Sequence, residues 1–128
     1  MNESEEASGA IDRSVLMGLR ELQIEGEPDI ISELCGLFLK HAPERIGAIL
    51  EAVEKGDARG LYAAAHGLKS SSAYVGAMRL SAMSRDLEEM GRSGELDGVR
   101  VKAELLREEY IRVAAALKAE MRSALQEE

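Results

Sequence analysis

Residues 63–77 read AAAHGLKSSSAYVGA, a stretch of small side chains around His66, one of only two histidines in the chain. Each residue of a helix advances about 100°, and on that wheel one group of side chains falls within roughly 40° of a common direction. The group consists of Leu61, Ala65, Leu68, Ser72 and Val75. His66 falls roughly 140° from that direction. The stretch therefore predicts a helix that buries one face and leaves the imidazole off the core.

Helical periodicity also runs through the rest of the chain, and no segment alternates in the way that strands do. We expect a short helix over 11–23, capped by Asp12. A second helical stretch should hold Pro28 in its first turn and end at Gly56. Pro43 lies inside it and permits either one long kinked helix or two helices that meet there. Further helices are expected over 57–75, from about residue 80 to an end in the GRSG of residues 91–94, and from residue 97 to about residue 121.

The apolar stripes of these helices supply the predicted core. The first helix contributes Ile11, Val15, Leu19 and Leu22, and the core filler is expected to include Met78, Met83, Met90 and Met121. Because the connections are short, consecutive helices should be antiparallel neighbours. The sequence thus predicts an all-α fold, an antiparallel up-and-down four-helix bundle with an additional short N-terminal helix. Residues 1–10 are expected to form an acidic flexible tail or linker, and residues 11–125 a single domain.

Composition and charge exclude several classes of function. The chain has 128 residues and a formal net charge of −8, so its surface should repel nucleic acid and anionic lipid. Cys35 is the single cysteine, which rules out an internal disulfide and indicates a reducing compartment. No stretch approaches the roughly 20 apolar residues that a transmembrane helix needs. We therefore expect a cytoplasmic protein that contacts neither nucleic acid nor membrane.

The surroundings of His66 favour chemistry at this histidine. Small residues surround it, with Ala63, Gly67 and Ser70 within about one turn and Ala73 two turns later, and Tyr62 lies on the same side of the wheel. Exposed helix faces normally carry long polar side chains, so a stripped patch suits the close docking of another protein. Histidine forms covalent intermediates, and Lys69 can offer positive charge to a phosphoryl group held on His66. The wheel argues against a buried histidine, but periodicity leaves an idle surface histidine open.

These residues resemble the signature of histidine-containing phosphotransfer (HPt) domains. The resemblance rests on His66, Leu68, Lys69, the small residues Ser70 to Ser72, and the structural turn at Gly76. It extends over roughly residues 11–120, through LCGLFLKHAPERIGAILEAVEKGDARGLYAAAH upstream and MRLSAMSRDLEEMGRSGEL downstream. Ser70 stands where the family usually has glycine.

The resemblance implies a helical bundle that carries a phosphoryl group on a ring nitrogen of His66. The group would come from the aspartyl phosphate of a receiver domain in a hybrid sensor histidine kinase and pass to the receiver domain of a response regulator. Such a phosphocarrier has no kinase activity of its own and needs no cofactor, because Mg²⁺ belongs to the receiver. We expect the protein to be a monomer. We also expect no metal site, since Cys35, His41 and His66 lack the spacing of metal-binding motifs.

Other functions remain as alternatives. A binding module of the same fold would dock a receiver domain without carrying phosphate, although loss of the histidine would be its usual mark. A purely structural bundle would make the motif a coincidence. A kinase is disfavoured, because the chain has no phosphate-binding glycine loop and is too short to add an ATP-binding domain.

Overall fold

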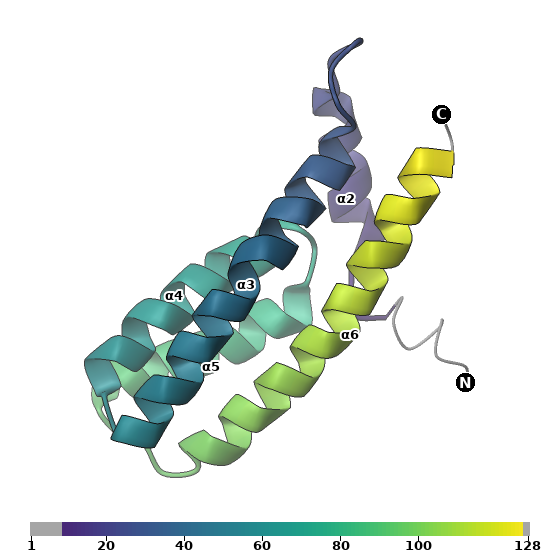
Figure 1. Cartoon of the computed structure of the whole chain (residues 1–128). Coiled ribbons are helices and arrows are strands. Elements are labelled where there is room, and N and C mark those ends of the chain that lie inside the picture. The colour runs from purple at the N-terminus through teal and green to yellow at the C-terminus, as the bar shows by residue number, and fades with distance from the viewer. Residues whose placement is uncertain (1–8, 127–128) are drawn as a thin grey trace.

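Four long helices run up and down in turn, and a short helix packs across one end of them (Figure 1). This computed structural model describes residues 9–126, and no strand occurs in that part of the chain. The long helices are α3 (Ile30–Lys55), α4 (Ala58–Tyr74), α5 (Met78–Ser93) and α6 (Val99–Gln126). The short helix is α2 (Arg13–Leu19), followed by one 3-10 turn, η1 (Arg20–Leu22). The predicted all-α fold, a four-helix bundle with an additional short N-terminal helix, is confirmed.

The helix ends follow from the residues that stand there. The side chain of Asp12 accepts a hydrogen bond from the amide of Ser14 at 3.0 Å, and Asp57 caps α4 in the same way. Gly56 ends α3 in the left-handed conformation, with φ of 63°, where a side chain would be strained. With so few residues between helices, each long helix must turn back along its predecessor.

The core lies between the four long helices. On α4, all five residues of the predicted core face are at most 2% exposed. The largest side chains that are fully buried are Leu16, Ile31, Ile49, Leu61, Leu68, Leu80, Leu87, Leu106 and Leu117. Helix α4 packs against α3 and α5, and α6 packs against the same two helices (Figure 1). Thus α4 and α6 lie on opposite sides of the bundle, and the outer face of α4 is free.

Helices α4 and α5 approach each other at the level of the backbone. Gly91 of α5 is buried, and a methyl group built on it would lie 2.6 Å from the amide nitrogen of Tyr62 and 2.7 Å from the carbonyl oxygen of Ala58. The expectation that this helix ends within GRSG is confirmed, although Gly91 itself is still helical. The helix continues to Ser93 and ends at Gly94, which has φ of 79°.

The N-terminal helix differs from the prediction over 11–23. Its last turn tightens into the 3-10 turn, which leaves Leu22 58% exposed, while Leu16 takes the buried position. The Gln23 side chain then ties the next loop, because its amide oxygen accepts a hydrogen bond from the amide of Ile30 at 2.7 Å. A period of three replaces 3.6 in this turn, so Leu22 leaves the predicted stripe. Ile11 is buried and Leu19 packs against the core, as expected.

The two prolines near and within α3 test two expectations, the place of Pro28 in the first turn and the effect of Pro43 on the helix. Pro28 precedes the helix, because Asp29 is the cap and accepts a hydrogen bond from the amide of Ser32 at 2.8 Å. Pro43 lies within one continuous helix and not between two. It occupies an exposed position, where the break in backbone hydrogen bonding faces water.

The remaining core expectations concern the methionines and the chain ends. Met83, Met90 and Met121 are half-buried against the core, but Met78 is 49% exposed at the start of α5, so its assignment to the core was wrong. Most of the predicted acidic tail, residues 1–8, lies outside the described residues, and Ala10 next to it is 2% exposed. The division at residues 10 and 11 stays a prediction.

Gly91→Ala should destabilise the bundle by about 1–3 kcal/mol, since the methyl group has to push α4 and α5 apart. Gly47→Ala is the matched control, because nothing lies within 4 Å of a methyl group at that exposed site of α3. The control should gain up to about 1 kcal/mol from better helix propensity. Urea denaturation followed by circular dichroism measures both changes, and equal stability of the two variants would contradict the close approach.

Candidate functional site

His66 stands on the outer face of α4, as the helical wheel predicts. Its side chain is 57% exposed, and the ring of Tyr62 one turn earlier lies against it, with centroids 5.9 Å apart and planes 17° from parallel. Burial as a core histidine is therefore excluded. The stacked tyrosine limits how the imidazole can rotate.

A carboxylate from the neighbouring helix binds both polar residues of the predicted site. Glu88 of α5 is only 13% exposed, and its two oxygens bind Nδ1 of His66 and Nζ of Lys69, the latter at 2.7 Å. The structure thus brings His66 and Lys69 together through a third residue. In the resting protein Lys69 is ion-paired with Glu88.

The hydrogen bonds at Glu88 decide which ring nitrogen of His66 is reactive. The bond from Lys69 is the largest of the effects that lower the pKa of Glu88, and the bond from His66 acts in the same direction. An ionised carboxylate only accepts hydrogen bonds, so Nδ1 of His66 must carry the proton. In the neutral ring the lone pair then lies on Nε2, which has no hydrogen-bond partner among residues 9–126. The arrangement presents a nucleophilic nitrogen to solvent.

The small residues around His66 do not share one environment. Ala63 and Ser70 are exposed, while Gly67 and Ala73 are half-buried at the edges of the outer face. The guanidinium of Arg45, from α3, lies over Gly67 so closely that a side chain at position 67 would collide with it. No long side chain therefore protrudes from the outer face of α4 at Ala63 and Ser70. On the side of α3, Arg45 borders this face.

Gly76 forms the turn between α4 and α5. Its φ of 82° is unfavourable for a residue with a side chain, and a methyl group there would lie 2.6 Å from the carbonyl oxygen of Asp12. The carbonyl of Gly76 in turn accepts a hydrogen bond from the amide of Asp12 at 2.8 Å. This turn joins the N-terminal segment to the helix pair that carries the site.

Sequence reasoning missed Glu88 and Arg45. A signal for Glu88 does exist, because His66 lies ten residues before Gly76 and Glu88 lies twelve residues after it. Two antiparallel helices joined at that turn place such residues at the same height. Arg45 has the same kind of signal, because it lies eleven residues before the turn at Gly56 and Gly67 lies eleven residues after it.

The described residues hold no cluster of histidine, cysteine, aspartate and glutamate side chains that could bind a metal ion. Within the same residues, none of the helices combines the length and the apolar character that a membrane crossing requires.

Comparison with known proteins identifies the family of this chain. Residues 33–126 match the model of the Hpt domain family. Histidine-containing phosphotransfer protein 4 of Arabidopsis thaliana is 30% identical over 96 residues, which cover 73% of this chain and 76% of that protein. The crystal structure of histidine-containing phosphotransfer protein B from Pseudomonas aeruginosa PAO1 superposes with a TM-score of 0.81 at 30% identity, over 89% of this chain and 96% of the other. The chain therefore belongs to the histidine-containing phosphotransfer family and is a histidine phosphotransfer module of a phosphorelay.

Proposed function

We propose that His66 accepts a phosphoryl group on Nε2 from the aspartyl phosphate of one receiver domain and passes it to the aspartate of another. The donor receiver would belong to a hybrid sensor histidine kinase and the acceptor to a response regulator. The observation that carries the proposal is the hydrogen bond from Nδ1 of His66 to Glu88, because it leaves Nε2 as the nucleophile.

The transfer balances without any proton leaving the site. The Nε2 lone pair attacks phosphorus, the bond between phosphorus and the aspartyl oxygen breaks, and the aspartate leaves as a carboxylate. The ring, which keeps its proton on Nδ1, becomes positively charged. Glu88 is placed to stabilise this charge, since a charge-assisted hydrogen bond is roughly twice as strong as a neutral one. Transfer to the second receiver reverses the same steps.

Lys69 would act next to this step through its charge. Its Nζ atom lies 2.7 Å from Glu88 in the resting protein, with 29% of the side chain exposed. When the imidazole becomes positive, Glu88 is drawn to the ring, and Lys69 can turn part of its charge to the phosphoryl oxygens. The lysine therefore both orients Glu88 and stabilises the transferred group.

The outer face of α4 would supply the docking surface around His66. Exposed Ala63 and Ser70 allow the backbone of a receiver to approach the imidazole, and Tyr62 borders the same face. Mg²⁺ would be bound by the receiver, and this chain would need no cofactor. We propose that the protein works as a cytoplasmic monomer.

His66→Gln should abolish phosphoryl acceptance and leave the fold intact, because the side chain is exposed and glutamine can still hydrogen-bond to Glu88. The measurement is incorporation of acid-labile, base-stable phosphate from a phosphorylated receiver, with circular dichroism as the folding control. Full labelling of the variant, with phosphate mapped to His41 by mass spectrometry, would contradict the assignment. A wild-type chain that binds receivers but never takes phosphate would be a binding module.

Lys69→Ala should slow single-turnover transfer by roughly a hundredfold, the cost of one electrostatic contact in a transition state. Receiver binding should change little, because Lys69 is largely turned toward Glu88. Stopped-flow or quenched-flow transfer assays measure the rate, and titration calorimetry measures the binding. An unchanged transfer rate would reduce Lys69 to a solvated helix residue.

Glu88→Gln should lower the stability of the folded chain at neutral pH but much less at acidic pH. The pKa of Glu88 is lowered from its ordinary value of 4.5, so its stabilising effect is present above pH 4.5 and is lost as pH falls through the lowered value. The wild-type chain should therefore be more stable than the variant at neutral pH, and the difference should shrink on acidification. Thermal unfolding at several pH values measures it. A difference that stays constant with pH would refute the ion-paired state.

Ser70→Trp should fold normally and bind a receiver poorly, because the indole would block close approach beside His66. Ser70→Gly should transfer at nearly the parent rate and lose on the order of 0.5 kcal/mol of helix stability. Val101→Trp is the matched control, since Val101 is 65% exposed on α6, on the opposite side of the bundle. Titration calorimetry compares the variants, and equal binding by both tryptophan variants would move the docking surface elsewhere.

A further inference from the structure

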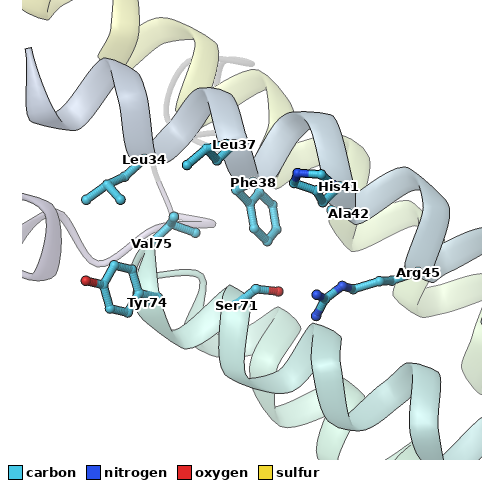
Figure 2. A pocket seen from close by; sticks show the side chains of 9 residues that line it. All are labelled: Leu34, Leu37, Phe38, His41, Ala42, Arg45, Ser71, Tyr74 and Val75. Carbon is cyan, nitrogen blue, oxygen red and sulfur yellow. The ribbon is translucent and has the colours of Figure 1, made fainter. Parts of the chain in front are cut away.

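A groove runs between α3 and α4 beside the His66 face. Figure 2 shows the nine side chains that line it, with those of α3 on one wall and Ser71, Tyr74 and Val75 on the other. The cavity has a volume of about 200 Å³ and its walls are mostly apolar. Leu37 and Tyr74 at its mouth are 53% and 55% exposed, so the groove opens onto apolar surface that faces water.

Arg45 closes one end of this groove. Its side chain reaches from α3 toward α4 (Figure 2). The guanidinium lies over Gly67, the residue next to His66. Ser71, the lining residue of α4 that is nearest to His66 in sequence, lies five residues after it, so an occupant of the groove would lie about 7.5 Å along α4 from the level of the imidazole. The hydroxyl of Ser71 donates a hydrogen bond to the carbonyl of Gly67 at 3.1 Å, and no hydrogen bond joins this hydroxyl to Arg45.

The charge of Arg45 has no partner among residues 9–126, in which it forms neither an ion pair nor a hydrogen bond, and no carboxylate among the described residues lines the groove. Arg59, Arg85 and Arg122 share this lack of a partner within the same range, but all three are exposed to water and Arg45 is half-buried. A guanidinium that is partly withdrawn from water against apolar walls keeps only part of its solvation. An anionic group from outside the chain would therefore gain a charge-assisted contact at Arg45 that no described residue supplies.

We propose that the groove between α3 and α4 selects the receiver domain, with Arg45 binding a receiver carboxylate while an apolar side chain of the receiver fills the groove. This rests on the proposed function, since it names the contacts by which the same partner is recognised. A carboxylate suits the guanidinium because the two form paired hydrogen bonds in one plane. The net charge of −8 repels a broadly acidic partner, so one carboxylate placed at Arg45 distinguishes a cognate receiver from a merely acidic protein.

The phosphoryl group on His66 is the competing anion for Arg45, and kinetics separates the two. An arginine that binds the receiver affects the receiver concentration needed for half-maximal transfer. An arginine that binds the phosphoryl group affects the maximal rate and the lifetime of phosphohistidine. The experiment therefore uses Arg45→Gln in single-turnover transfer at increasing concentrations of the receiver domain, from the source organism, that phosphorylates the wild-type chain fastest.

We expect the half-maximal concentration to rise about tenfold, as for the loss of one charge-assisted hydrogen bond, with the maximal rate and the phosphohistidine lifetime unchanged. Arg45→Lys should recover part of the loss, because it keeps the charge without the planar fork. Leu37→Ser should raise the same concentration, and Leu105→Ser, at a site 49% exposed on α6, is its matched control and should not. Circular dichroism checks that all four variants fold.

Two results would overturn the proposal. If Arg45→Gln lowers the maximal rate or shortens the phosphohistidine lifetime at an unchanged half-maximal concentration, Arg45 serves the phosphoryl group. If Arg45→Gln and Leu37→Ser behave like Leu105→Ser, the groove is not a docking site, although the wild-type chain still transfers phosphate. A wild-type chain that accepts phosphate from none of the organism's receivers would refute the proposed function itself and this inference with it.

Discussion

The close backbone approach of α4 and α5 is the constraint on which the rest of the site depends. Gly91 removes the side chain that would separate the two helices, and Gly76 makes the turn that sets their relative height. With the helices at this distance, Glu88 meets both Lys69 and His66. A wider spacing would leave the carboxylate in solvent, and the imidazole would lose the bond that selects its tautomer. The glycines of α5 and of the turn therefore serve the chemistry as well as the fold.

Much of the fold follows from local pattern, because helix periodicity and capping depend on near neighbours in sequence. The exposure of His66, the core face of α4 and the cap at Asp12 were all predictable in this way. Leu22 and Met78 were not, since one lies in a tightened turn and the other at a helix start, where a regular wheel no longer applies. Pro43 was ambiguous because its effect depends on whether the broken hydrogen bond faces water or core.

The candidate site was predictable only along one helix. His66 and Lys69 stand out because they share a face of α4 and lie among small residues. Glu88 depends on the register between two helices, and a shift of two residues would turn a different side chain toward the imidazole. Arg45 depends on a third helix and on the length of its own side chain. Sequence thus indicates which atoms react, whereas packing decides which groups orient them.

The two flanks of α4 are chemically different, and the difference separates two tasks. On the α5 flank, Glu88 and Lys69 form a nearly neutral pair that shares its bonds with the imidazole, so that flank is suited to holding charge during transfer. On the α3 flank, Arg45 forms no ion pair within the described chain, and Leu37 exposes apolar surface at the mouth of the groove. That flank is therefore suited to recognition of a partner. Because the groups on the two flanks belong to different helices, a substitution on α3 can change which receiver binds without moving the carboxylate that orients His66. A chain built in this way can vary in partner while its transfer chemistry stays the same.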